Sequence, residues 1–483
     1  MPWLDAAAPV RMRRVALVAP AASLRDVLVE VADAGTMEID QSGTDAARPG
    51  PCTRLLRAAG REHQAPALSA VPPDPGELDR AGRYDLLAGE AQLEAHAAGA
   101  VRRSGAAGLA GWLPAHRLPE VAGRIADLGG ALVPLPYPPG VQAPTLIGGP
   151  PLRRSLTPLV RTYGTVPYAD IDPSWLAWFS YVLMFGMMFG DAGQGMLLVG
   201  AAVALRAGWP AWARRYRAAW PFVGGAGVAA TLFGFLYGEC FGPTGLVPTL
   251  WLNPLDEPIP LLLAALAVGA VLLAGAYALG AVNRWREGGW PVALYAPSGV
   301  AGSSLFLGVG VAAGGWYFHQ GALVWAGVTI AVTGLVLAFI GFFTEAGGRG
   351  TGVVQASVEL FDLVIRLGSN VVSFARLAAF GLTHAALGLL VWEGTIALWH
   401  KGGAMMVAAV AVFAVGNAVT FALEALVAAI QALRLEYYEL FSRVFQLQGR
   451  EFRPWHVPAS SDPVPASAAP GPGKEVGMPC SPG

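Results

Sequence analysis

The chain has 483 residues, of which 54% are hydrophobic and only 13% are charged, and its mean hydropathy is +0.49. Soluble globular proteins are about 25% charged, so this composition excludes an ordinary soluble protein and indicates a membrane protein with several spans. The net charge of −1 gives no electrostatic basis for binding nucleic acid, and the three cysteines lie too far apart for a metal or disulfide pattern.

Residues 1–165 are polar enough for a small cytoplasmic α/β domain, and their apolar patterns predict two similar halves. No secretory apolar region opens the chain, so we expect a cytoplasmic N-terminus. A helix is also expected within 85–103, between the halves. The expected elements of the two halves are, in order, a strand at 14–19, a helix from Ser23 to a stop at Gly35, a strand at 37–39, a strand at 108–113, a helix at 118–128 and a strand at 131–135.

Residues 166–455 are expected to form an α-helical polytopic membrane domain, and residues 456–483, rich in Pro, Ser and Ala, a disordered tail. The first two apolar segments are short and meet around Asp191, so the sequence allows one helix or two there. The apolar segments lie at 174–190, 192–207, 219–238, 259–282, 290–317, 322–343, 356–398 and 404–445.

Arginines follow the second, fourth, sixth and eighth apolar segments, whereas the loops after the third and fifth segments contain none. Eight spans with the N-terminus inside therefore place nearly every arginine cluster in the cytoplasm, and Lys401 is the exception. Seven spans would place those clusters outside. The abundance of Arg, Ala and Gly suggests a bacterial genome, so we expect a multi-pass protein of a bacterial plasma membrane with both termini in the cytoplasm.

The last two apolar segments are longer than the about 20 residues that cross a bilayer, and each has a polar stripe. In the seventh segment, steps of four and three residues place five polar residues on one helical face: Asp362, Arg366, Ser369, Ser373 and Arg376. Asn370 and His384 are further polar residues of this segment. The spacing favours an intrahelical pair between Asp362 and Arg366. The eighth segment has a similar face: Asn417, Thr420, Glu424, Gln431 and Arg434.

An arginine in the bilayer costs from about 2.5 to over 10 kcal/mol, so it needs a partner or a wet cavity. Arg376 could be paired internally, with Asp362 or Glu424. Alternatively, it could act as a fixed cation that forces a passing carboxylic acid to ionise, because a nearby positive charge lowers the pKa of an acid. Two striped helices in succession favour an ion path, and titrating groups such as His384 would line it.

Several stretches resemble the membrane subunit a, or subunit I, of V-type and archaeal A-type rotary ATPases. In the family's order, these stretches are "GWLPAHRLPEV" (111–121), "LVRTYGTVPYADIDPS" (159–174), "MFGMMFGDAGQG" (184–195), "LFGFLYGECFG" (232–242), "SNVVSFARLAAFGLTHAALG" (369–388) and "LRLEYYELFSRVFQLQGREFRPW" (433–455). The resemblance implies eight membrane helices, with the last two long, tilted and curved around a rotating proteolipid ring.

The resemblance also implies roles for single residues. Arg376 matches the essential arginine that meets the ring carboxylate, and Arg434 matches a second helpful arginine. Glu424, His384 and Asp362 match acidic or titrating positions of the half-channels. Four further residues are expected to line the half-channels: Ser373, Asn370, Gln431 and Asn417.

The function implied is that of a stator subunit that conducts H⁺ past the rotor without ATP chemistry, cofactor or metal of its own. Its partners would be the carboxylate-bearing ring subunits, the central and peripheral stalk subunits through the N-terminal domain, and the lipid bilayer. The chain departs from the family in several places: the coiled-coil arm is reduced, Gln194 stands where histidine is common, and Phe380 and Thr383 stand where smaller or apolar residues are expected. A stand-alone secondary transporter and a non-conducting assembly scaffold are the alternatives.

The glycine-rich "FGDAGQG" (189–195) is superficially similar to a phosphate-binding loop, but no GK[ST] follows it. Its flanks are membrane-like, so the sequence predicts a tight turn between helices rather than a nucleotide site.

Overall fold

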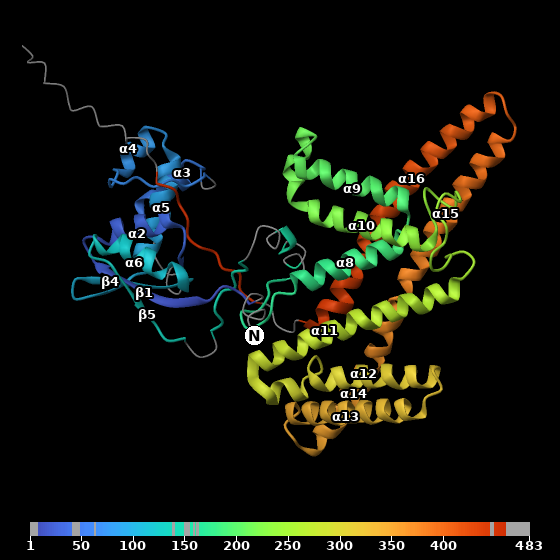
Figure 1. Cartoon of the computed structure of the whole chain (residues 1–483). Coiled ribbons are helices and arrows are strands. Elements are labelled where there is room, and N and C mark those ends of the chain that lie inside the picture. The colour runs from blue at the N-terminus through green and yellow to red at the C-terminus, as the bar shows by residue number, and fades with distance from the viewer. Residues whose placement is uncertain are drawn as a thin grey trace, which may run out of the picture. The chain divides into compact units, whose positions relative to one another are not determined.

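In a computed structural model, the chain forms two compact units. One is Val10–Leu146 together with the chain from Arg450, and the other includes Ile147–Gly449 (Figure 1). The boundary therefore lies before Ile147 rather than after residue 165, because Thr145 N–H still donates to the Arg450 carbonyl (2.6 Å). The structure describes residues 8–40, 49–61, 64–137, 141–148, 155–157, 160, 164–444 and 449–459.

The N-terminal unit is an antiparallel sheet of strand order β2-β4-β1-β5, with β3 paired to β4. The order β1α2β2–β4α6β5 is a split β-α-β arrangement, and both predicted halves are confirmed. Its elements are β1 (Met12–Pro20), α2 (Leu24–Ala34), β2 (Glu38–Ile39), α3 (Pro51–Ala58), α4 (Pro75–Arg80), α5 (Tyr84–Ala98), β3 (Val101–Arg103), β4 (Ala106–Pro114), η2 (Ala115–Arg117), α6 (Leu118–Ala126) and β5 (Ala131–Pro134).

The core of this unit lies between the sheet and the helices. Side chains alternate along β1, so that Val15 and Leu17 are buried. They pack in one cluster with Val27 and Val31 of α2. Helix α2 ends at Gly35, as predicted, in a left-handed conformation (φ 57°) that favours glycine.

The segment 450–459 belongs to the N-terminal unit and not to the membrane domain or to a disordered tail. Val457 is fully buried in the core cluster, and its N–H donates to the Ala32 carbonyl (3.2 Å). Glu38 forms an ion pair with Arg450 and accepts from the Arg453 N–H (2.8 Å). Contrary to the prediction, residues 450–455 are therefore not part of the membrane domain, and 456–459 are not part of a disordered tail, because Val457 completes a core formed by distant elements. Residues 460–483 of the predicted tail lie outside the described residues.

We predict that Val457→Asp releases this segment, because a buried unpaired carboxylate costs about 3 kcal/mol or more. Limited trypsin digestion should then cut faster after Arg450 or Arg453. The matched control is Val71→Asp, since Val71 is 68% exposed in the same unit. Equal cleavage rates for the two variants would contradict the docking of 450–459.

The second unit is helical, and each of the eight predicted apolar segments contains a helix. Among the described helices, six stretches are long and apolar enough to cross a membrane, whereas α8 and α9 have 15 and 16 residues. The structure resolves the first pair as two helices. The elements are α8 (Ser174–Met188), α9 (Ala192–Ala207), η3 (Ala211–Ala219), α10 (Trp220–Tyr237), α11 (Pro258–Tyr295), α12 (Val300–Tyr317), α13 (Gly321–Glu345), α14 (Gly350–Ser373), α15 (Ala375–Trp399), α16 (Ala404–Leu435), the π-helical turn Glu436–Phe441 and α17 (Ser442–Val444).

The predicted segment 290–317 is divided between two helices. Gly288 and Gly289 kink α11, with Gly289 in a left-handed conformation (φ 73°), and the helix then continues to Tyr295. Only after a short connection does α12 begin at Val300. The apolar run is therefore interrupted by chain geometry that hydropathy alone does not reveal.

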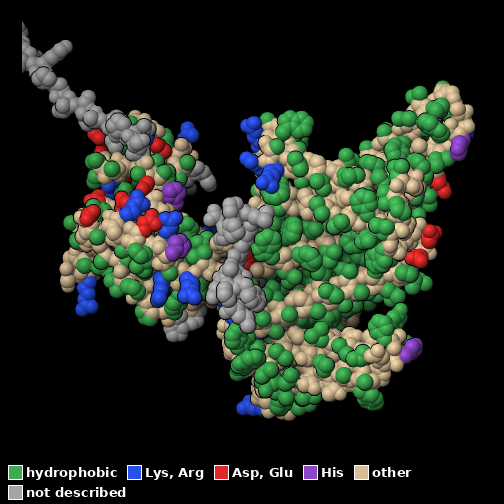
Figure 2. Space-filling view, viewed as in Figure 1, with side chains coloured by type: hydrophobic (Ala, Val, Ile, Leu, Met, Phe, Trp, Pro, Cys, Tyr) green, Lys and Arg blue, Asp and Glu red, His purple; other side chains and the backbone are tan. Residues whose placement is uncertain are grey.

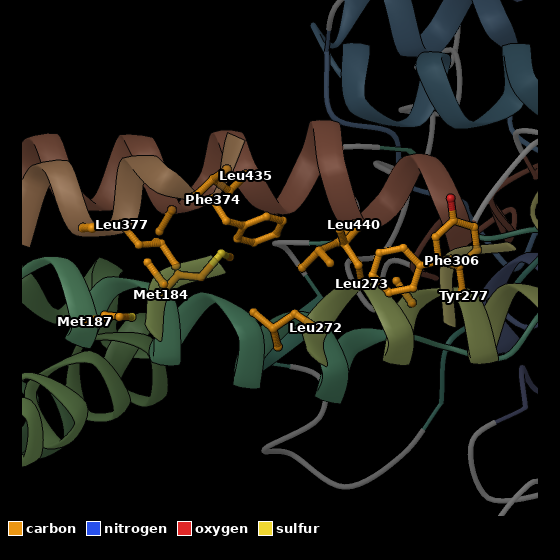
Figure 3. Packing of buried hydrophobic residues seen from close by; sticks show 14 of the residues in the cluster. Met184, Met187, Leu272, Leu273, Tyr277, Phe306, Phe374, Leu377, Leu435 and Leu440 are labelled. Atoms are coloured by element: carbon orange, nitrogen blue, oxygen red, sulfur yellow. The ribbon is translucent and has the colours of Figure 1, made fainter. Parts of the chain in front are cut away.

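The seventh segment is also divided, at Phe374, between α14 and α15. Phe374 is fully buried and packs in the core of this unit with residues of α8, α11 and α16 (Figure 3). A Cβ at Gly269 of α11 would lie 2.2 Å from the Phe374 ring, so the glycine provides the space for it. The expected overlong helix thus kinks two residues before Arg376.

A buried ionic cluster holds the segment before α8 against the end of α11. Arg284 pairs with Glu287 and lies 4.0 Å from Asp170, and both Arg284 and Asp170 are buried. Asn283 accepts from the Ile171 N–H (3.0 Å) and donates to the Val444 carbonyl (3.4 Å). Burial, followed by the hydrogen bond and negative charge of Glu287, raises the pKa of Asp170 to about 8.

This raised pKa means that the folded protein keeps a proton on Asp170 that the unfolded chain loses near pH 4. The associated stability is present below pH 4 and is lost as the pH rises to about 8. We predict that Asp170→Asn reduces the fall in melting temperature of the purified chain between pH 5 and pH 8. An Asn variant with the wild-type pH dependence would show that Asp170 is ionised in the folded state.

Candidate functional site

The turn between α8 and α9 positions the first acidic group of the candidate site. Asp191 is fully buried, and its carboxylate accepts from the Gln194 N–H (2.8 Å) and from the Gly242 N–H (3.0 Å). It therefore caps α9 and holds the loop that follows α10. The prediction of a tight turn at "FGDAGQG" is confirmed.

The loop after α10 lies against α15. A Cβ at Gly242 would lie 2.8 Å from the Gly388 carbonyl oxygen, so this close approach requires glycine. The loop also contains Glu239, which is buried (4% exposed). Its own carbonyl accepts from the Ala192 N–H (2.9 Å).

His384 of α15 and Glu424 of α16 form a buried pair through the imidazole Nδ1 and the carboxylate. The Phe189 ring packs on the imidazole, with centroids 4.9 Å apart, and packs edge-on against Phe421. The second carboxylate oxygen of Glu424 is buried and has no hydrogen-bond partner within the described part of the chain. The pair thus retains an unsatisfied acceptor that water or a proton can occupy.

Asp191 and Glu239 extend this pair into a cluster. Burial raises the pKa of Glu239 to about 7; the charge of His384 opposes this rise, whereas the charges of Asp191 and Glu424 contribute to it. Three carboxyl groups and one imidazole therefore act on one another in a buried region. Neither Asp191 nor Glu239 was expected at a site from the sequence, although an acidic residue between apolar segments is a visible signal.

Asn417 of α16 also faces α9. Its side-chain oxygen accepts from Gln194 Nε2 (3.3 Å), and its own amide donates to the Phe413 carbonyl (3.0 Å). Gln194 is therefore part of the polar contact between α9 and α16. Gln431 is half-buried, and its side-chain oxygen has no partner among the described residues.

Arg376 lies on α15 and Arg434 on α16, and these two helices pack against each other. Arg376 is half-buried and Arg434 is exposed. Neither guanidinium forms a hydrogen bond or ion pair with a described residue. Internal pairing of Arg376 with Asp362 or Glu424 is therefore wrong, because those carboxylates have other partners.

Asp362 instead pairs with Arg366 at 2.5 Å, as the spacing predicted. Both side chains are at least half exposed. The structure does not bring Asp362 to the cluster of His384 and Glu424, from which the kink at Phe374 separates it along the chain.

A second polar cluster lies on the other side of Arg376 along the chain. Asn370, with its amide oriented to suit its neighbours, donates to Glu439 (2.8 Å) and accepts from Arg443. The Arg443 guanidinium lies over the Tyr277 ring, 5.6 Å from its centroid. Ser373 is more peripheral, and its hydroxyl donates to the Ser369 carbonyl (3.1 Å).

The two arginines therefore lie between two polar clusters on the last two membrane segments. His384 is eight residues beyond Arg376, which is about 12 Å along a helix. Asn370 is six residues before Arg376, towards the opposite helix end. Basic side chains gather at one end of the helices of this unit and acidic ones at the other (Figure 2).

The helices that contain these residues expose a large apolar surface. Within Ala404–Val444, only 11% of the most apolar 18-residue stretch is buried inside the chain. Exposed side chains near the arginines include Val372, Leu423, Val427 and Ile430. Such a surface is suited to lipid or to further membrane helices.

No protein-family model matches the chain. It is similar to A-type ATP synthase subunit I of Archaeoglobus fulgidus, with 26% identity over 406 residues, covering 72% of this chain and 58% of that protein. The corresponding protein of Thermococcus kodakarensis is 26% identical over 329 residues, covering 65% and 48%. V-type ATP synthase subunit I 2 of Treponema pallidum is 32% identical over 158 residues, covering 29% and 34%.

These similarities, at about 26% identity over most of the chain, support the subunit I family of A-type and V-type ATP synthases. The resemblance noted in the sequence motifs is thereby confirmed. The chain spans about half the length of the curated relatives it matches.

We predict that His384→Ala and Glu424→Gln each lower the melting temperature of the purified chain, because each removes the partner of a buried polar group. Their combination should cost less than the sum, with a coupling of about 0.5–3 kcal/mol. Thr383→Ala is the matched control, since that neighbour on α15 is exposed. Strictly additive losses would show that the two side chains do not stabilise each other.

Proposed function

We propose that the chain is the membrane-embedded stator subunit of a V/A-type rotary ATPase and conducts H⁺ along two half-channels beside a proteolipid ring. One observation supports the proposal most strongly. Arg376 and Arg434 lie between two polar clusters, and neither guanidinium forms an ion pair with a described residue. The subunit carries out no ATP chemistry itself. It couples ion translocation to ATP hydrolysis or synthesis elsewhere in the complex.

The acidic cluster forms one half-channel. A proton at the acidic helix end meets Glu239 and Asp191 and passes to the pair of His384 and Glu424. The free carboxylate oxygen of Glu424 provides an acceptor on this route. The other half-channel includes Asn370, Ser373, Glu439 and Arg443, with Asp362 nearer the helix start.

Arg376 keeps the two half-channels apart. A neutral ring carboxylic acid that approaches it ionises, because the guanidinium within about 4–6 Å lowers the pKa of the acid. The proton leaves through one half-channel, and the carboxylate must take another proton before it returns to lipid, since an ion there is costly. Arg434, close to Arg376, extends the positive region that the carboxylate crosses.

The ring is the partner that the exposed apolar surface of α14–α16 accommodates, and the N-terminal unit contacts stalk subunits. With the basic helix ends in the cytoplasm, both termini lie there, and the protein spans a bacterial plasma membrane eight times. A stand-alone transporter would not require an unpaired arginine on an open apolar surface.

We predict that Arg376→Gln reduces ATP-driven acidification of membrane vesicles to the background rate while the complex still assembles. Arg366→Gln is the matched control, because Arg366 is paired with Asp362 and exposed. It should keep most of the pumping rate.

ATP hydrolysis and co-purified subunits are measured on the same vesicles. Pumping by Arg376→Gln at the wild-type rate would assign this arginine a structural role. Purification without ring or stalk subunits would favour the stand-alone transporter.

A further inference from the structure

A cavity of about 680 Å³ lies between α8, α9 and α10, away from the polar clusters. Its walls are aromatic and aliphatic, and Arg206 is the one charged residue among the described residues that line it. The side chains that matter most are Trp175, Trp178, Val203, Arg206, Trp220 and Val228.

Small residues create this hollow. Gly224, Gly225 and Ala202 line it, and a Cβ at Gly225 would already lie 2.8 Å from the Trp178 ring. The Trp178 indole N–H donates to the Pro221 carbonyl (3.1 Å), which fixes the ring at the wall. The cavity is therefore formed by packed helices and not by a single mobile side chain.

The cavity opens to the outside of the helical unit. Trp175 is 49% exposed, Val203 64% and Val228 50%. These helices lie in the membrane unit, so the opening faces the hydrocarbon region, where acyl chains surround the protein. An apolar groove at this depth suits an acyl chain better than a water-soluble ligand.

The mouth of the cavity is basic. The Arg206 guanidinium lies 4.7 Å from the centroid of the Trp220 ring and is exposed. Three more exposed arginines follow in η3: Arg214, Arg215 and Arg217. Figure 2 shows basic side chains gathered over this end of the unit.

Exposed aromatic residues mark the depth of this mouth. Trp209 and Trp212 are each 72% exposed, and Tyr216 is 49% exposed. Such rings gather where lipid headgroups meet hydrocarbon, so Arg206 is at headgroup level. Basic pockets between membrane helices on the cytoplasmic side attract anionic headgroups.

We propose that this cavity binds an anionic phospholipid, with an acyl chain along Trp178 and Val228 and the phosphate at Arg206. The positive-inside rule makes this basic end the cytoplasmic leaflet. The charge of the mouth selects an anionic headgroup over a zwitterionic one, and the apolar walls hold the chain. This site is independent of the proton path proposed above.

The test is native mass spectrometry of the full chain, purified in detergent and equilibrated with equal amounts of phosphatidylglycerol and phosphatidylcholine. Wild type should retain phosphatidylglycerol preferentially. Arg206→Gln should lower this preference about fivefold. Val228→Trp, which fills the groove, should lower retention of the lipid itself.

Arg349→Gln is the matched control, because Arg349 is exposed at the same basic end but does not line the cavity. It should behave like wild type. The proposal is overturned if wild type retains both lipids equally, or if Arg206→Gln and Val228→Trp bind phosphatidylglycerol as wild type does. It is also overturned if a co-purified membrane helix, rather than lipid, cross-links to position 228.

Discussion

The cost of placing a permanent positive charge in hydrocarbon governs the arrangement of this membrane unit. A guanidinium does not lose its proton at any working pH, so the surrounding chain must provide water, a carboxylate or a partner protein. Here the nearby carboxylates are already engaged: Asp362 with Arg366, and Glu424 with His384. The charge of Arg376 is therefore available to something outside this chain. An arginine without a partner among the described residues is a reason to look for its function in an assembly.

Close packing elsewhere makes the polar clusters possible. Gly195 and Gly227 allow α9 and α10 to approach until a Cβ on Gly227 would lie 2.7 Å from the Val199 nitrogen. The same packing brings Asp191 and the loop after α10 together, and Gly242 lets that loop lie against α15. Glycines thus position acidic groups without taking part in their chemistry. The hollow beside Trp178 is another product of these small residues.

The N-terminal unit and the last described residues depend on each other in a different way. Its core includes Val457, and its strand β2 meets the returning chain through Glu38. Although the chain leaves this unit before the membrane helices, it returns after them. The core of the N-terminal unit is therefore completed only by chain that follows the membrane helices.

The amino-acid sequence by itself determined the class of protein, the eight apolar segments and the polar stripes, because hydropathy and helical periodicity are local properties. It also determined the pair of Asp362 and Arg366, whose spacing along one helix is enough to bring them together. The sequence motifs were sufficient to indicate the family.

Only the tertiary structure decided which polar residues meet. The pairing of His384 with Glu424 and the approach of Glu239 depend on contacts between separate segments of the chain, as does the lack of a partner for Arg376 among the described residues. The kink at Phe374 depends on the space at Gly269, and the docking of 450–459 on a core formed by other elements. Such contacts depend on how elements pack in three dimensions, and no periodicity in the sequence encodes them.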